Sequence, residues 1–229
     1  KKIQQNTLLM HSTLPSELKI SPVYIPMSEV GGDFYCINKL NESTYRIFLA
    51  DATGHGVQAA MITMAVKGIY DNIKLYELEV NTILEIFNND FINRYHSLNS
   101  FLTAIIIDIN IQTQKIIFAS AGHPAAILLQ DDSYRLLGKT GGMIGIRKNE
   151  LYHSNEMMFY PNERLYLFTD GIFEQFNSLD EEFGEDRLYS SLLKNFHLNI
   201  EHSIQEVLTQ LDKFLDGKRR QDDITILGV

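Results

Sequence analysis

The sequence predicts an α+β domain built on antiparallel β-sheet. Short apolar runs separated by turn residues follow one another closely at 101–109, 115–121, 125–129 and 134–137. Strands at this spacing form hairpins, whereas parallel strands would need a long crossover between them. Helical periodicity is instead concentrated in a few segments before and after these strands. No repeat or low-complexity linker divides the 229 residues, so we expect one such domain.

Composition and charge argue against several classes of protein. The net charge of −9 is unfavourable for a general nucleic-acid binder, which needs a basic surface. The longest apolar runs, such as 101–107, are too short to span a bilayer, so we expect no membrane contact by this chain. The single cysteine, Cys36, excludes an intrachain disulfide and favours a reducing, cytoplasmic location. We interpret it as a small buried thiol rather than a redox switch.

The first residues are expected to form a regulatory segment. Residues 1–12 favour a helix that ends before Pro15, and the chain begins with Lys1 rather than Met, so we interpret it as part of a longer protein. We therefore predict a helical linker or regulatory segment over 1–19 and a single folded domain over 20–229. A membrane anchor in the missing upstream region is compatible with this interpretation.

The first hairpin is predicted to bring two carboxylates together. After a strand at 20–25 and a pair of glycines, Asp33 opens an aromatic, strand-like run, and the next strand, 44–50, ends just before Asp51. In an antiparallel pair the start of one strand lies beside the end of the other. Asp33 and Asp51 should therefore be neighbours, which is unfavourable unless a cation or a proton offsets their repulsion.

Helices are predicted where apolar residues recur at a spacing of three and four. They cover 57–70, 82–95 with Asn81 as its N-cap, 172–176, 188–196, and a last helix with apolar positions from 204 to 215 that stops at Gly217. Met61 and Met64 fall at core spacing in the first helix and are interpreted as packing residues. The glycine-rich segment 141–145 lacks the lysine of a P-loop and is predicted to be a mobile loop.

Aspartates recur at the ends of the predicted strands. A strand runs into Asp170, and Asp222 with Asp223 opens the last strand, so four segments place an aspartate in this position. A single such aspartate is usually a turn residue, but four are harder to explain that way. Hard divalent cations prefer carboxylate oxygens, and two ions can activate a water and clamp a phosphoryl group. The pattern indicates a divalent metal site.

Five short motifs span most of the chain, from about residue 17 to 229. They are Glu29-Val30-Gly31-Gly32-Asp33-Phe34-Tyr35, Asp51-Ala52-Thr53-Gly54-His55-Gly56, Ser120-Ala121-Gly122-His123-Pro124, Thr169-Asp170-Gly171-Ile172 and Asp222-Asp223-Ile224-Thr225. Each is weakly specific alone. Together and in this order they resemble the PPM-type metal-dependent serine/threonine phosphatases, and more narrowly their bacterial SpoIIE/RsbU-like branch. One departure is Cys36, which stands where this branch often has Asp.

The resemblance implies a fold and a set of metal ligands. The fold would be a four-layer α-β-β-α sandwich of two antiparallel sheets flanked by helices, with two Mn²⁺ or Mg²⁺ ions between the sheets. Asp51 would bridge both ions. The other implied ligands are Asp33 and the backbone carbonyl of Ala52 for the first ion, and Asp170 and Asp222 for the second, with Asp223 the less certain member of its pair.

Three further residues of the motifs lie close to the implied metals. Gly54 lets the chain turn away from the metal-bridging Asp51. Two roles are open for His55, which either orients water or phosphate or packs the loop. His123, before Pro124, is expected to be structural or to support the site from behind.

The implied activity is hydrolysis of phosphoserine or phosphothreonine by a water that bridges the two ions, with Asp33, Asp51, Asp170 and Asp222 as catalytic residues. The expected substrate is a phosphorylated STAS-domain anti-anti-sigma factor in a bacterial partner-switching pathway. The resemblance also implies an upstream sensor or receiver module. We add the hypothesis that 1–19 contributes to a homodimer or switch interface.

The same residues raise alternatives of other classes. A catalytically weak pseudophosphatase that serves as a protein-binding or dimerisation module stays open. The Gly-Gly-Asp run resembles a nucleotide cyclase motif, but Phe34 stands where that motif is acidic. A protease or esterase is not supported, because the sequence has no Gly-x-Ser-x-Gly elbow and no His-Glu-x-x-His helix.

Overall fold

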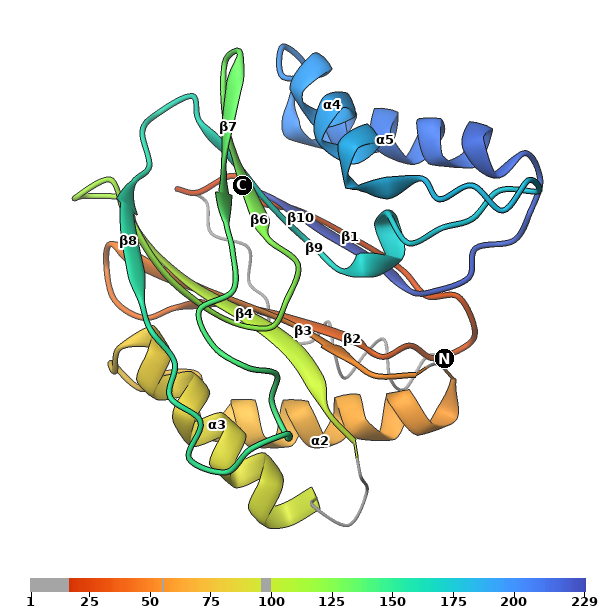
Figure 1. The fold of residues 1–229 in the computed structure, drawn as a ribbon. Coiled ribbons are helices and arrows are strands. Elements are labelled where there is room, and N and C mark those ends of the chain that lie inside the picture. The colour runs from red at the N-terminus through yellow and green to blue at the C-terminus, as the bar shows by residue number, and fades with distance from the viewer. Residues whose placement is uncertain (1–16, 55, 96–99) are drawn as a thin grey trace.

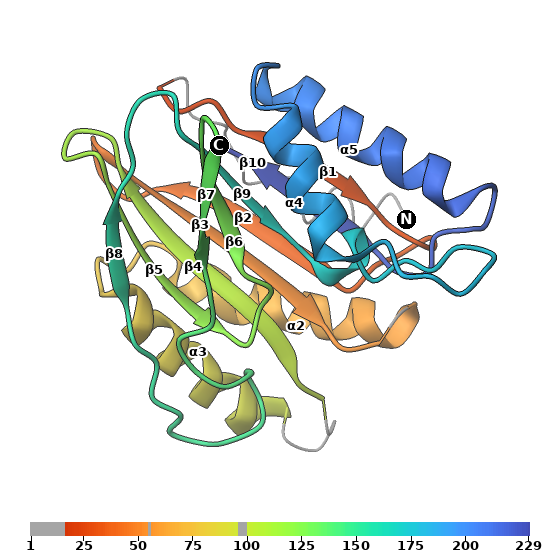
Figure 2. The same ribbon diagram turned by 45° about the horizontal axis from the view of Figure 1, so that its top comes forward.

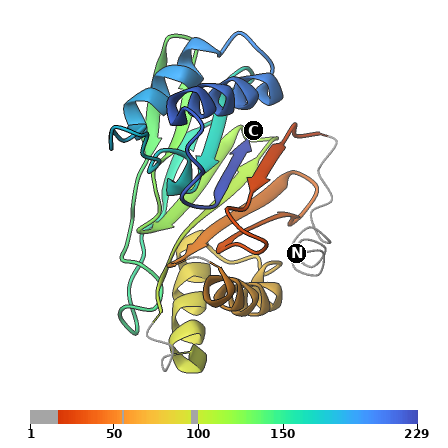
Figure 3. The same ribbon diagram turned by 90° about the vertical axis from the view of Figure 1, so that its right-hand side faces the viewer.

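Two β-sheets pack face to face, and a pair of helices covers the outer face of each. The computed structural model describes residues 17–54, 56–95 and 100–229, with only the backbone of Val57. Figure 1 and Figure 3 show the four layers, and the named strands pair antiparallel throughout. The four-layer α-β-β-α sandwich implied by the family resemblance is therefore confirmed.

Each sheet has five strands. The first has the order β1-β10-β9-β6-β7 and the second the order β2-β3-β4-β5-β8. The strands of the first sheet are β1 (Ser21–Ile25), β6 (Ala126–Gln130), β7 (Ser133–Leu137), β9 (Arg164–Phe168) and β10 (Ile224–Gly228). Those of the second are β2 (Asp33–Lys39), β3 (Thr44–Ala52), β4 (Leu102–Asn110), β5 (Lys115–Ala121) and β8 (Asn155–Met158).

The helices divide between the two sheets, as the turned view in Figure 2 also shows. Helices α4 (Gly184–Lys194) and α5 (Ile200–Leu215) pack on the first sheet, and α2 (Val57–Ile73) and α3 (Val80–Tyr95) on the second. Among these helices of the described ranges, none is long and apolar enough to cross a membrane.

Strand β3 shows how alternation builds the core. Ile47 and Leu49 point toward the other sheet, whereas Phe48 and Ala50 point toward α2 and α3. All four side chains are at most 1% exposed. Because a strand in this sandwich is covered on both faces, it appears in the sequence as a continuous apolar run.

The start of α3 differs from the prediction. The helix begins at Val80, and the carbonyl of Glu79 accepts the backbone hydrogen bond from Ile83. Asn81 is therefore inside the first turn and is not the N-cap, and its Oδ1 is buried without a hydrogen-bond partner among the described residues. The helix starts earlier because Val80, 1% exposed, joins the core beneath it.

The prediction that Met61 and Met64 are core residues was wrong. They are 70% and 41% exposed. The buried face of α2 is instead formed by Ile62, Val66 and Ile69. Both faces have apolar residues at helical spacing, so the sequence pattern did not determine which of them meets the sheet.

The glycine-rich segment is anchored, in contrast to the predicted mobile loop. Ile144 is fully buried, and its backbone exchanges two hydrogen bonds with Leu102, at 3.0 and 3.1 Å. Gly145 donates a hydrogen bond to the Asn88 side chain of α3. The segment bridges the ends of the inner strands β4 and β5 and packs against α3.

Other boundaries also moved. In place of a helix at 172–176, the structure has a single 3-10 turn at Asp170–Ile172. Strand β8 was not predicted, because Asn155–Met158 lacks β-branched and aromatic residues, and it forms by pairing with β5. Of the predicted segment 1–19, only residues 17–19 are described, and they are not helical, so the helix expected at 1–12 lies outside the described residues.

Candidate metal centre

Two of the predicted carboxylates face each other at one end of the second sheet. Asp33 is the first residue of β2 and Asp51 the last but one of β3, and the antiparallel register pairs them directly. The neighbouring strand β4 places Thr103 on the other side of Asp51. The prediction that the hairpin makes these two aspartates neighbours is confirmed.

A third carboxylate reaches the pair from the first sheet. The carboxylate of Asp51 lies close to those of both Asp33 and Asp170, and Asp170 follows β9. Burial, and after it the negative charges of Asp33, Asp170 and Asp222, raise the pKa of Asp51. Burial also raises the pKa of Asp33 and of Asp170. Carboxylates this close repel one another unless protons or cations are present.

Asp33 is held in place by two threonines of the opposite sheet. Its Oδ2 accepts hydrogen bonds from Thr225 Oγ1 at 2.6 Å and from Thr169 Oγ1 at 2.9 Å, and all three side chains are at most 2% exposed. These bonds link the two sheets at the carboxylate cluster. Sequence reasoning missed both threonines, although each stands in a motif that it quoted, next to Asp170 and two residues after Asp223.

Asp223 shapes the loop before β2. Its Oδ1 accepts from the backbone N–H of Met27 at 2.7 Å and its Oδ2 from that of Gly32 at 2.6 Å. The side chain is buried, 4% exposed, and both oxygens are engaged. This geometry gives Asp223 the role of fixing the connection between the two sheets, and its predicted role as a metal ligand stays a prediction.

Glycines allow these segments to approach closely. A Cβ on Gly171 would lie 1.9 Å from the carbonyl oxygen of Asp223. A Cβ on Gly32 would lie 2.9 Å from the carbonyl oxygen of Ala52, the predicted backbone ligand. Larger residues at either position would push the aspartate-bearing segments apart.

The turn after Asp51 leads directly into α2. Gly54 and Gly56 have φ angles of +93° and +76°, a region that favours glycine, and both would tolerate a Cβ only with backbone strain. Helix α2 then begins at Val57. His55 lies outside the described residues, so its two proposed roles stay predictions.

His123 supports the strand beside Asp51 and does not face solvent. It is 4% exposed, and its Nδ1 lies 2.8 Å from Thr103 Oγ1. Burial lowers the pKa of His123 to about 3, so the ring is neutral at physiological pH. This placement agrees with the expected structural or supporting role.

The donor set fits a hard divalent cation, although the ligands are not fully drawn together. Asp33, Asp51 and Asp170 offer carboxylate oxygens from three segments, the chemistry that Mg²⁺ and Mn²⁺ prefer. Within 17–54, 56–95 and 100–229, however, no three acidic, His or Cys side chains already surround one point.

A large cavity lies away from the carboxylates. It has a volume of about 1310 Å³ and is lined by Asn110, Arg164 and Val229, at the strand ends opposite to the carboxylates. Its wall includes residues from 17–21 and from α4 and α5, which form one helical layer. The aspartates thus lie at the opposite strand ends and do not line this cavity.

Sequence comparisons relate the chain to one protein family and to several named bacterial proteins. The family described as Stage II sporulation protein E (SpoIIE) matches residues 41–229. Phosphoserine phosphatase RsbP of Bacillus subtilis is 31% identical over 184 residues, which cover 76% of this chain and 44% of RsbP. Protein IcfG of Synechocystis is 26% identical over 257 residues, 100% of this chain and 40% of IcfG. The chain spans less than half of either relative.

Solved structures share the fold. The SiaA-PP2C domain of Pseudomonas aeruginosa has a TM-score of 0.83 at 23% identity and covers 99% of this chain and 88% of that one. RsbX in complex with magnesium has a TM-score of 0.64 at 20% identity and covers 91% and 93%. At these identities the likeness concerns the fold alone. With the family match over 41–229 and the likeness to RsbP, the chain belongs to the SpoIIE family, the SpoIIE/RsbU-like branch of the PPM-type phosphatases.

Proposed function

We propose that this chain is a metal-dependent protein phosphatase that hydrolyses phosphoserine or phosphothreonine. The observation that carries the proposal is the meeting of the Asp33, Asp51 and Asp170 carboxylates, from three separate segments, at one edge of the sandwich. Such a cluster needs protons or cations to offset its repulsion. Membership of the SpoIIE family supports cations as that counter-charge.

Two Mn²⁺ or Mg²⁺ ions are the proposed cofactors. Asp51 would contribute to both, Asp33 and the carbonyl of Ala52 would hold one, and Asp170 and Asp222 the other. When bound, such ions lower the pKa of a water and neutralise charge on a phosphoryl group.

The chain's own residues would keep these ligands in position. Thr169 and Thr225 fix one oxygen of Asp33, which leaves the other available to a metal ion. The neutral His123 supports Thr103, the neighbour of Asp51 across the strands. In this arrangement Thr169, Thr225 and His123 hold the ligands in place and need not exchange a proton with the substrate.

The proposed substrate is a phosphorylated STAS-domain anti-anti-sigma factor in a bacterial partner-switching pathway. The relatives RsbP and RsbU of B. subtilis are named phosphoserine phosphatases, and one solved structure joins the RsbU and RsbW domains of Rv1364c from Mycobacterium tuberculosis. These names support a protein substrate carrying phosphoserine. We also propose a cytoplasmic site of action, an upstream sensor or receiver module and a homodimer.

The proposal is tested by Mn²⁺-dependent phosphate release from p-nitrophenyl phosphate and from a serine-phosphorylated STAS-domain protein. Asp51→Asn should lower kcat/KM on both by at least about a hundredfold, because the metals contribute several kcal/mol. Asp131→Asn, in the exposed turn between β6 and β7, is the matched control and should keep full activity. Turnover that persists in EDTA, or in Asp51→Asn, would contradict the proposal.

A pseudophosphatase that binds a protein partner or dimerises is the alternative. The observation that favours it is that no three-ligand group is preformed in the described ranges. A folded wild-type chain that binds the phosphorylated STAS-domain protein but releases no phosphate at saturating Mn²⁺ would support this alternative.

A further inference from the structure

One side chain ties together the two segments that carry Asp170 and Asp222. Gln175 is fully buried, with 0% exposure. Its Nε2 donates to the carbonyl of Gly171 at 2.7 Å, and its Oε1 accepts from the backbone N–H of Gln221 at 2.9 Å. Gly171 directly follows Asp170, and Gln221 directly precedes Asp222. The amide thus bridges the backbone beside both predicted ligands of the second ion.

The link is reinforced from the other side. The side-chain Nε2 of Gln221 donates to the carbonyl of Phe176 at 3.0 Å. The side chain of each glutamine is thus hydrogen-bonded to the backbone of the segment that carries the other. The Gln175 carbonyl also accepts a hydrogen bond from Phe183 at 2.8 Å, which holds the chain after the turn. A shift of either segment would break several of these bonds at once.

Only an amide satisfies both backbone groups at this position. A glutamate would lack the donor for the Gly171 carbonyl, and a methionine would lack both donor and acceptor. The bond to the Gly171 carbonyl is buried, so its loss would leave that carbonyl unsatisfied, and the Gln221 N–H would lose its link to the Gly171 segment. An apolar side chain would fill the same volume, which isolates the bridge as the specific contribution of glutamine.

We propose that Gln175 is a positioning residue for the metal centre, whose amide fixes the spacing between Asp170 and Asp222 so that both carboxylates can bind one ion. The inference rests on the proposed metal-dependent function and adds a residue that touches neither ion nor substrate. Residues that orient metal ligands typically change metal affinity about 10- to 100-fold when they are replaced.

Direct titration with Mn²⁺ tests the proposal. The EPR signal of free Mn²⁺ reports binding to the whole chain without any turnover. Gln175→Met should raise the Kd of one Mn²⁺ site by about tenfold or more. In parallel, kcat on p-nitrophenyl phosphate should fall at low Mn²⁺ and recover at saturating Mn²⁺, whereas KM for the aryl phosphate stays within about twofold of wild type.

Asn88 offers a matched control. It is also 0% exposed, and its amide donates to the Arg147 carbonyl at 2.8 Å and accepts from the Gly145 N–H at 2.9 Å. It therefore makes the same two-way bridge between backbone groups, but in segments that carry no predicted ligand. Asn88→Leu should lower Tm as Gln175→Met does and leave the Mn²⁺ affinity unchanged.

A milder variant keeps the test open if Gln175→Met does not fold. Gln221→Ala removes only the outer contact to Phe176 and should raise the same Kd by a smaller factor, about two- to fivefold. Wild-type Mn²⁺ affinity in folded Gln175→Met, or in Gln221→Ala where Gln175→Met does not fold, would overturn the inference. A wild-type chain that binds no Mn²⁺ would instead overturn the proposed function, so the two failures are distinguishable.

Discussion

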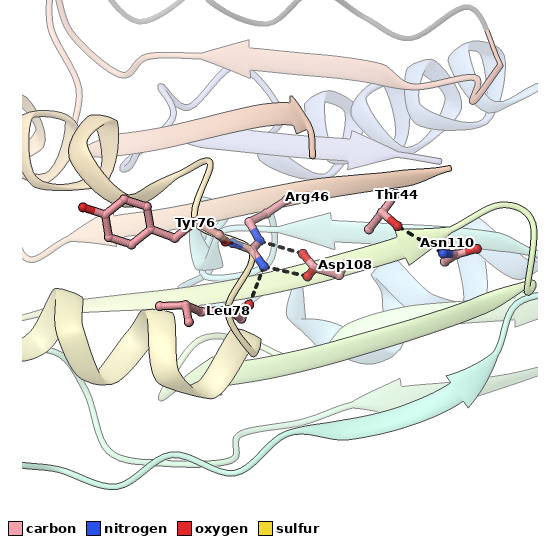
Figure 4. A network of polar contacts seen from close by, with 6 residues as sticks. All are labelled: Thr44, Arg46, Tyr76, Leu78, Asp108 and Asn110. Carbon is pink, nitrogen blue, oxygen red and sulfur yellow. Dashed lines mark hydrogen bonds and ion pairs between the residues drawn. The ribbon is translucent and has the colours of Figure 1, made fainter. Parts of the chain in front are cut away.

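Arg46 and Asp51 lie on the same strand, β3, but the charge of Arg46 is paired with an opposite charge, whereas Asp51 lies beside like charges. The Arg46 side chain is fully buried, and its Nε and Nη2 donate to the two carboxylate oxygens of Asp108, both at 2.7 Å (Figure 4). Its Nη1 and Nη2 also donate to the carbonyls of Tyr76 and Leu78, at 2.8 and 2.9 Å. The charge is paired, and the pair anchors the connection between α2 and α3.

At the other end of β3, like charges face each other. Asp51 contacts Asp33 and Asp170, and burial with these charges raises its pKa. Burial raises the pKa of Asp108 as well, and the guanidinium of Arg46 offsets part of that rise. The ion pair of Arg46 with Asp108 therefore maintains the fold at one end of β3. At the other end, protons or cations are needed to offset the repulsion among the aspartates.

Removal of Arg46 should have the largest effect on stability. Arg46→Met removes the cationic partner of Asp108, whose side chain is only 16% exposed, and two hydrogen bonds to backbone carbonyls, so we expect a loss of about 3–5 kcal/mol in the free energy of unfolding. Urea unfolding at pH 7 measures it. The double variant Arg46→Met/Asp108→Leu should recover most of the loss, because no buried charge is then left unpaired. A loss below about 1 kcal/mol would mean that the pair contributes little.

His123 shows a third treatment of a buried ionisable group, since it stays neutral. Burial lowers its pKa to about 3, while in the unfolded chain it takes up a proton near pH 6.5. The unfolded state therefore binds more protons as the pH falls from 6.5 toward 3, and the folded state loses stability over that window. The expected slope is about 1.4 kcal/mol per pH unit, or nearly 3 kcal/mol by pH 4.5.

The His123 effect is isolated by comparison with His123→Gln. Unfolding free energies of both proteins between pH 7 and 4.5 should differ in slope, because glutamine cannot take up the proton. The aspartates titrate in both proteins and cancel in the difference. Parallel pH profiles would show that His123 is protonated in the folded state, contrary to its burial.

Asp51→Asn should change stability with the opposite sign to Arg46→Met. In EDTA at pH 7–8, removal of one carboxylate from the cluster relieves repulsion, and we expect about 1–2 kcal/mol of added stability. Added Mn²⁺ should stabilise the wild type and leave the variant unchanged. Thermal unfolding with and without Mn²⁺ measures both effects. A variant that is less stable than wild type in EDTA would show that the cluster is already compensated.

The contact between Asp33 and Asp51 could be predicted from the sequence, whereas the ion pair between Arg46 and Asp108 could not. Asp33 and Asp51 are joined by a short hairpin, so their pairing follows from local register. Arg46 and Asp108 stand on β3 and β4, which are separated in the chain by both helices of that layer. Nothing local in either strand indicates that an arginine within an apolar run has its partner there.

Contacts between the two sheets could not be predicted from the sequence either. Thr169 and Thr225 meet Asp33 only because the sheets stack, and neither threonine lies near Asp33 in the sequence. Gln175 fell inside a predicted helix at 172–176, whereas in the structure its amide replaces helical hydrogen bonds with contacts to Gly171 and Gln221. Periodicity predicts apolar packing well but carries no information on such polar bridges.

Substitution of Cys36, on the neighbouring strand β2, should have the smallest effect on activity. It is 5% exposed, its Sγ lies 3.2 Å from Asn38 Oδ1, and burial raises the pKa of its thiol. At pH 8 we expect alkylation by iodoacetamide to be at least about tenfold slower than in urea, because both access and the thiolate fraction are low in the folded state. Cys36→Ala should change Mn²⁺-dependent turnover by less than about twofold, since the side chain contacts the hydrophobic layer beneath α2 and not the carboxylates. If peroxide abolished turnover in the wild type but not in Cys36→Ala, the thiol would be a redox switch, and an uncharged buried group on β2 would control the carboxylate cluster.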